Sequence, residues 1–131
     1  NESGIDLSQK GTLLKTQQDH SISFEINQCT IYGLAYTIIN SGSKPLTLNI
    51  SNTLFGGFQS GQTVKGYEEG TTVNSSENVY TASDSPFHSN ALGECLTITS
   101  AELFNAPAAA NGDFTVKIDT YKTYGDQRWN K

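Results

Sequence analysis

The side chains of this sequence that could carry out chemistry are few and widely spaced. Its two histidines, His20 and His88, lie in polar, turn-like stretches, and no paired spacing such as HxxxH or CxxC is present. A structural zinc site needs three or four Cys, His or carboxylate ligands, so the sequence argues against such a site. We expect both histidines to be exposed to solvent.

Two groupings contain the residue types of hydrolytic sites. Asp19, His20 and Ser21 have the three types of a catalytic triad, but neighbours on one strand point to opposite faces and cannot form a relay. Glu68 and Glu69 could act on a glycosidic bond, yet two carboxylates in a glycine-flanked turn are usually just solvated. We therefore expect no enzymatic activity and no cofactor, and keep a small secreted hydrolase as a less favoured alternative.

The two cysteines, Cys29 and Cys95, lie in similar settings, NQCTI and GECLTI, each followed by a β-prone stretch. We predict that they form one disulfide. Closing a loop of this length would stabilise the fold by about 4 kcal/mol in the chain-entropy model. The alternative is a pair of free buried thiols, which would indicate a reducing compartment.

The composition indicates one small acidic domain. The 131 residues allow a single domain over 1–131, with a loose N-terminal segment at 1–10. The net charge is −5, and only eight Lys and Arg residues are spread along the chain. No basic patch could neutralise a phosphate backbone, so we expect no nucleic-acid partner.

The polar residues indicate an extracellular protein. Ser, Thr, Asn and Gly supply most of the polarity, methionine is absent even from position 1, and no apolar run reaches 18 residues. We expect a secreted or cell-surface protein whose signal peptide has been removed. Asn49 and Asn74 each begin a glycosylation pattern, but matches this frequent arise by chance in such a composition.

Alternation of apolar and polar residues is the main structural pattern. It predicts a strand over 21–27, a bulge near Asn27–Gln28 where the alternation changes parity, and a hairpin whose second strand covers 46–50. Weaker candidates are 72–73, 78–81 and 96–99, and 113–120 is the clearest strand of all. Residues 100–104 could start one helical turn, and 107–112 have the Pro-first, Gly-last order of a short helix.

These elements predict an all-β fold of about seven or eight short strands. We expect an antiparallel two-sheet β-sandwich, with a small barrel as second choice. We recognise no internal repeat and no linker in the sequence. No predicted helix is long enough to bury a core face alone.

Aromatic residues mark two candidate binding regions. In TLFGGFQSG, residues 53–61, Phe55 and Phe58 flank a glycine pair. They could be core residues around a bulge, or they could cover the mouth of an apolar cavity or form an exposed tip. Near the C-terminus Tyr121, Tyr124 and Trp129 could form a platform for a sugar ring, with Tyr121 on the outer face of its strand.

Three stretches together resemble the MD-2-related lipid-recognition (ML) domain: LTLNISNTLFGGFQSGQTV at 46–64, Ser85-Pro86-Phe87, and PAAANGDFTVKIDTYKTYGDQ at 107–127. The resemblance implies a secreted two-sheet sandwich that holds a lipid between its sheets, with Phe55 and Phe58 near the cavity edge. Its lining would be Leu48, Ile50, Phe114, Val116 and Ile118. Ser85 stands where the family has cysteine.

Two functions therefore suit the sequence. The first is a secreted, non-enzymatic protein that binds a lipid, another apolar small molecule or a lipid surface. The second is a carbohydrate-binding or adhesin-like module of a cell-surface appendage, recognising a surface glycan. In the second case an incomplete sandwich could associate with further subunits by strand addition.

Overall fold

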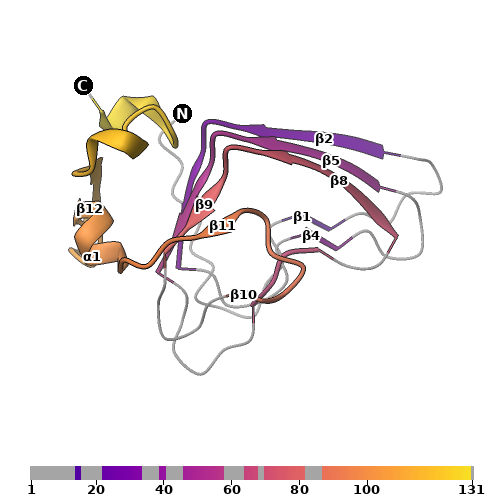
Figure 1. Cartoon of the computed structure of the whole chain (residues 1–131), viewed down its shortest axis with the longest axis horizontal. Coiled ribbons are helices and arrows are strands. Elements are labelled where there is room, and N and C mark those ends of the chain that lie inside the picture. Colours follow the sequence, from indigo (N-terminus) through magenta and orange to yellow (C-terminus); the bar gives the residue numbers. More distant parts are fainter. Residues whose placement is uncertain are drawn as a thin grey trace.

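The computed structural model describes residues 14–15, 22–33, 39–40, 46–57, 64–67, 70–81 and 87–130. Over these residues the chain winds as a parallel β-solenoid, in which equivalent strands of successive coils lie side by side (Figure 1). One side consists of β2 (Ile22–Asn27), β5 (Leu46–Ser51) and β8 (Thr71–Ser76), in that order. Positions 22, 46 and 71 pair in register, so a coil spans 24 or 25 residues.

The other two sides of the coil are formed by shorter strands. The second side has the order β11-β9-β6-β3 and is parallel throughout: β3 (Thr30–Tyr32), β6 (Leu54–Gly56), β9 (Val79–Tyr80) and β11 (Glu94–Cys95). The third side has two parallel pairs: β1 (Leu14–Lys15) with β4 (Ile39–Asn40), and β7 (Val64–Lys65) with β10 (Phe87–Ser89).

Equivalent corners join the first side of each coil to the second. Gln28, Asn52 and Glu77 occupy them, with φ angles of 51°, 50° and 53°. A left-handed residue turns the chain sharply, and asparagine adopts this conformation more readily than most residues. The corners also bond to one another, because the Asn52 side chain donates to Oδ1 of Asn27 over 3.2 Å.

Two cores lie on opposite faces of the second side. Inside the coil, Phe55 and Tyr80 pack with Leu46, Leu48 and Ile50. Leu54 and Val79, the preceding residues on the same strands, point outward into a separate cluster. The central strands β6 and β9 are therefore buried on both faces, which explains why they have adjacent apolar residues while β5 alternates.

The outer core is covered by the C-terminal unit, residues 99–130, which lies beside the second side of the solenoid (Figure 1). The unit consists of α1 (Ser100–Leu103), the antiparallel pair β12 (Phe104–Ala106) and β13 (Asp113–Val116), and the 3₁₀ turns η1 (Asp119–Tyr121) and η2 (Gln127–Trp129). Leu103, Phe104 and Val116 supply its fully buried apolar side chains.

Polar contacts hold the C-terminal unit on the solenoid. Oγ of Ser100 accepts a hydrogen bond from the backbone N–H of Gly57 over 2.8 Å and lies 3.0 Å from Oγ1 of Thr81. At the other end of the unit, the N–H of Gly125 donates to the carbonyl of Asn52 over 2.7 Å. Gly125 has φ +72°, and a Cβ there would lie 2.7 Å from Cδ1 of Leu54.

The predicted antiparallel two-sheet sandwich is wrong, because the strands of the coils pair in parallel and β12 with β13 is the antiparallel pair of the described strands. The hairpin ending in 46–50 is wrong for the same reason, since both partners of β5 run parallel to it. Alternation was confirmed: Leu46, Leu48 and Ile50 are buried. Alternation reports which side of a strand is buried and says nothing about the direction of its neighbour.

Local predictions had mixed outcomes. The parity change at Asn27–Gln28 is a corner of the coil, not a bulge. One helical turn does begin at Ser100. Residues 107–112 form turns, closed by a hydrogen bond from Gly112 to Ala109, and 96–99 form no strand.

The predicted disulfide is also wrong: Cys29 and Cys95 are free and lie far apart. Cys29 precedes β3 and Cys95 belongs to β11, at opposite edges of a four-stranded sheet. Three strand spacings of about 4.8 Å separate these edges by about 14 Å. A disulfide requires Cα atoms within about 7 Å.

Asn78 is a buried polar link between coils, with 4% of its surface exposed. Its Oδ1 accepts from the N–H of Thr53 over 3.0 Å, and its Nδ2 donates to the carbonyl of Ile50 over 2.9 Å and to Oγ of Ser75 over 2.8 Å. The side chain thus satisfies two buried backbone groups of the preceding coil.

We expect Asn78→Ala to lower the free energy of unfolding by about 3 kcal/mol, because it leaves buried backbone groups without partners. Asn74→Ala, in the same coil but exposed, should change it by about 0.5 kcal/mol. Urea denaturation followed by circular dichroism measures both. Equal effects of the two substitutions would contradict the role assigned to Asn78.

The C-terminal unit contains four carboxylates whose pKa values are lowered by hydrogen bonds to the ionised form. The main donors are the backbone N–H of Thr99 to Glu102, the side chain of Asn105 to Asp113, Lys122 to Asp119 and Arg128 to Asp126. Glu102 bonds Thr99 as in a capping box, over 2.7 Å. Among the described residues, these four carboxylates are the ones whose pKa is lowered, and all four belong to the C-terminal unit.

Acid should therefore loosen the C-terminal unit before the solenoid. A pKa lowered in the folded state stabilises the protein above the unfolded pKa of about 4, and this stabilisation is lost as the pH falls through the folded value. Trp129, the single tryptophan, reports on the unit. We expect its fluorescence to change at a higher pH than the far-ultraviolet β signal. Coincident transitions would show that the two parts unfold together.

Candidate functional site

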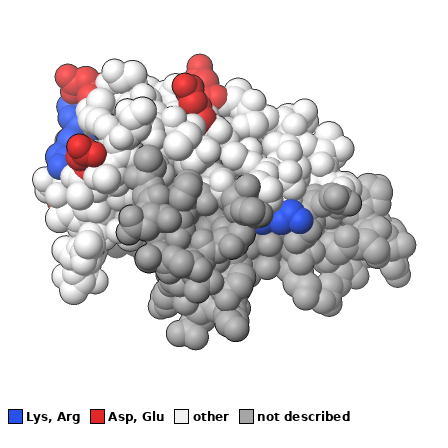
Figure 2. Space-filling view, turned by 60° about the horizontal axis from the view of Figure 1, so that its bottom comes forward, with Lys and Arg blue, Asp and Glu red and all other residues white. Residues whose placement is uncertain are grey.

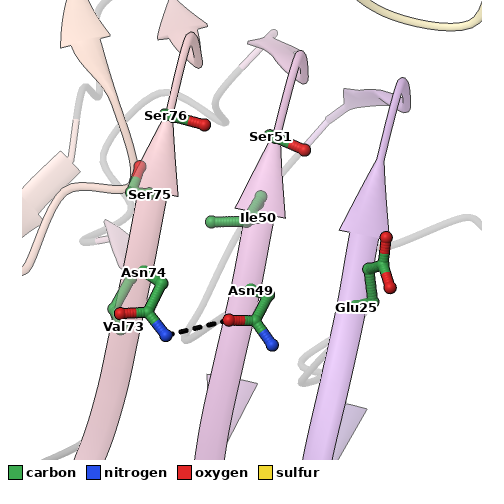
Figure 3. Close-up of a pocket in the computed structure, with 8 residues that line it drawn as sticks. All are labelled: Glu25, Asn49, Ile50, Ser51, Val73, Asn74, Ser75 and Ser76. Atoms are coloured by element: carbon green, nitrogen blue, oxygen red, sulfur yellow. Dashed lines mark hydrogen bonds between the residues drawn. The ribbon is translucent and has the colours of Figure 1, made fainter.

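The outer face of β2-β5-β8 is a polar surface with an open depression of about 540 Å³. Figure 3 shows the side chains of Glu25, Asn49 and Asn74 in one row across the three strands. The depression is lined by these three and by Ile50, Ser51, Val73, Ser75 and Ser76. The side chain of Ile50 is 1% exposed and packs inside the coil, so the polar side chains provide the groups that a ligand could reach.

The row exists because the strands pair without a shift. Glu25 pairs with Asn49, and Asn49 with Asn74, in the parallel register of the coils. Nδ2 of Asn74 donates to Oδ1 of Asn49 over 2.8 Å (Figure 3). The amides are thereby oriented, and the row offers a carboxylate and two amides at the spacing of neighbouring strands, about 4.8 Å.

A second polar row lies closer to the corners. It contains Asn27, Ser51 and Ser76, which pair in the same register. Oγ of Ser51 donates to Oδ1 of Asn27 over 3.0 Å, so the first two members are also oriented. The face therefore presents hydroxyl, amide and carboxylate groups in two parallel rows.

The face carries little charge. Of the residues that line the depression, Glu25 is the charged one, and its side chain is exposed. Figure 2 shows the molecule from another side, where acidic and basic side chains adjoin at one end and the described residues form no continuous basic patch in that view. Such a surface suits a ligand bound by hydrogen bonds more than a polyanion.

The predicted pair Phe55 and Phe58 is only partly described. Phe55 lies inside the coil, 0% exposed, with its ring 5.6 Å from that of Phe87 in an edge-to-face arrangement. Phe55 is thus a core residue, which is one of the interpretations of TLFGGFQSG, and its predicted part in ligand binding stays a prediction. Phe58 lies outside the described residues, so its predicted role stays a prediction.

The predicted aromatic platform lies in the C-terminal unit. Tyr121 and Tyr124 are half-buried, with their rings 5.7 Å apart and edge-to-face. Trp129 packs against Phe114 at 5.5 Å and is 36% exposed. Tyr121 belongs to η1, so its predicted place on the outer face of a strand is wrong. Its contribution to binding stays a prediction.

The remaining chemical candidates form no described site. Within the described ranges no group of three His, Cys, Asp or Glu side chains could hold a metal ion. His20, Glu68 and Glu69 lie outside those ranges, and His88 belongs to β10. None of the helices described is both long and apolar enough to cross a membrane.

Comparisons with known proteins give no relatives: no family model, curated protein or solved structure matches this chain. The resemblance to the ML domain therefore stays a resemblance of three stretches. The sandwich that it implies is wrong. Of the cavity lining that it implies, Leu48 and Ile50 lie inside the coil, whereas Phe114, Val116 and Ile118 pack in the outer core.

Sequence reasoning missed the polar rows, although the sequence contains a pattern that could have revealed them. Residues 22–33, 46–57 and 71–81 repeat one scheme: a six-residue strand, a left-handed corner and two adjacent apolar residues. Asn49 and Asn74 hold the same place in this scheme. They were noticed only as glycosylation patterns.

The two thiols differ in their surroundings. Cys95 is exposed, whereas Cys29 is half-buried. Burial raises the pKa of the Cys29 thiol, which also donates a hydrogen bond to the carbonyl of Asn27 over 3.4 Å. A raised pKa leaves less thiolate at a given pH, and the thiolate is the reactive form.

We expect mass spectrometry to find two free thiols per chain after unfolding without a reductant. In the folded protein at pH 8, iodoacetamide should modify Cys95 at least about 5-fold faster than Cys29, whose thiolate is scarcer and less accessible. Cys29→Ser and Cys95→Ser assign the two rates. A mass two hydrogens below that of the sequence, with neither cysteine alkylated, would show a disulfide and contradict this prediction.

Proposed function

We propose that this protein is a non-enzymatic recognition module that binds a carbohydrate on the outer face of β2-β5-β8. The observation that carries the proposal is the in-register row of Glu25, Asn49 and Asn74 beside an open depression. Amide and carboxylate groups form paired hydrogen bonds with hydroxyl groups. A regular spacing along the row suits a ligand whose polar groups also recur, such as a polysaccharide.

The orientation of the row supports this function. Asn49 and Asn74 are held by their mutual hydrogen bond, so ordering them on binding costs less side-chain entropy. The central strand β5, beneath Asn49, is buried on its inner face and is thus a rigid support. The face lacks an aromatic platform among its described lining residues, and we therefore expect weak binding, with Kd of about 0.1–1 mM.

An apolar ligand, the function that the sequence favoured first, stays a proposal without an observation in its support. Among the described residues, aromatic rings pack closely inside the coil: those of Tyr80 and Phe87 lie 4.8 Å apart, and Phe55 contacts the ring of Phe87. A secreted or cell-surface location would suit a glycan ligand and belongs to the same proposal.

A glycan array of neutral and acidic oligosaccharides, followed by calorimetry on the best ligand, tests the proposal. We expect Glu25→Ala and Asn49→Ala each to weaken binding about 10-fold, which corresponds to about 1.4 kcal/mol. Each removes hydrogen-bonding groups from the row. Thermal unfolding should show that both variants remain folded.

Glu94→Ala is the matched control for Glu25→Ala, since it also removes an exposed strand carboxylate but lies in β11, on another side of the coil. It should leave binding unchanged. Absence of any bound glycan, or binding by the Glu25 and Asn49 variants at wild-type strength, would reject the proposed site.

A further inference from the structure

The three-stranded side of the solenoid ends at β8. Among the described strands β8 pairs with β5 alone, whereas the second side continues by one more strand, β11. After β11 the chain leaves the coil and enters α1 at Ser100. The last coil therefore extends the second side and leaves the β2-β5-β8 sheet one strand short.

The backbone of β8 presents hydrogen-bonding groups at this edge. The carbonyl of Ser76 faces the preceding coil, because it accepts from the N–H of Asn52 over 3.2 Å. Backbone groups alternate in direction along a strand. Those of Ser75 and Val73 consequently point away from β5, to the edge of the sheet.

Burial shows that this edge is open. Ser75 pairs with Ile50 and faces the inside of the coil as Ile50 does, yet Ser75 is exposed while Ile50 is 1% exposed. Val73 is half-buried, whereas its neighbour Leu48 is 0% exposed. The inner side of β8 is thus less covered than that of β5.

The edge also lacks the usual protection against pairing. Natural edge strands carry lysine, proline, bulges or inward charges that prevent association. The strand TTVNSS has none of these, and its pairing with β5 proceeds over six residues without a shift. In a chain with a net charge of −5, an uncharged edge strand is a surface fit for pairing.

We propose that β8 pairs with β8 of a second copy of this chain, forming an antiparallel dimer about a two-fold axis perpendicular to the sheet. Val73 of each copy then lies opposite Ser75 of the other, and the edge-facing groups of these residues exchange two pairs of hydrogen bonds. Asn74 lies opposite its own equivalent. The dimer joins two three-stranded sheets into one of six strands.

A second copy of this chain is a suitable partner for the β8 edge, because the strand is complementary to itself. An asparagine amide can both donate and accept: within the chain the Nδ2 of Asn74 donates to Asn49, and its Oδ1 is an acceptor that a second copy could use. Glu77, the acidic residue next to the strand, lies opposite Thr71 in this register and meets no like charge. A two-fold contact is also closed, so it yields a dimer and no fibre.

Analytical ultracentrifugation of the full chain from about 1 µM to 1 mM tests the proposal. We expect a concentration-dependent monomer–dimer equilibrium, weakened at least 10-fold by Asn74→Lys, which places two lysines opposite each other. Thr47→Lys adds the same charge to the same face but on the central strand β5, and it should retain the dimer. A monomer at every concentration, or equal weakening by both substitutions, would overturn the proposal.

Cross-linking tests the register independently. In a Cys29→Ser, Cys95→Ser background, Asn74→Cys should form a disulfide-linked dimer on oxidation. Opposed residues of a non-hydrogen-bonded pair have Cα atoms about 4.5 Å apart, within the range of a disulfide. Thr47→Cys in the same background should remain monomeric. Failure of Asn74→Cys to cross-link at concentrations where the unmodified chain is dimeric would overturn the proposed pairing.

Discussion

The stacking of equivalent corners at Gln28, Asn52 and Glu77 is the constraint on which the rest of the structure depends. Each corner turns the chain at the same point of its coil, and the backbone N–H of Gln28 and of Asn52 bonds to the strand of the following coil. Register is thereby set at once for two sides of the solenoid. A slip of one residue would turn the apolar side chains of β5 to solvent.

The same winding produces two different kinds of sheet. The side containing β5 is buried on its inner face alone, so polar residues can occupy every second position and line up across the coils. The side containing β6 has the C-terminal unit on its outer face and needs apolar residues at consecutive positions, Leu54 and Phe55. The candidate binding face exists because one side of the coil was left uncovered.

Much of the local structure could be predicted, and the fold could not. The alternation of 46–50 was confirmed residue by residue, and so was the helical turn at Ser100. Parallel pairing was missed because alternation looks the same for either direction of the neighbouring strand. The repeat was missed because the inward-facing residues differ between coils. Val73 takes the place of Leu48, and Ser75 takes the place of Ile50.

The sequence by itself determined the acidic charge and which side of β2 and of β5 is apolar, because these follow from side-chain chemistry within a few residues. Only the tertiary structure decided which strands are neighbours, and hence that Glu25, Asn49 and Asn74 form one row and that the two cysteines lie apart. Pairing of this kind joins residues about 25 positions apart, and it depends on how whole coils bury their cores together.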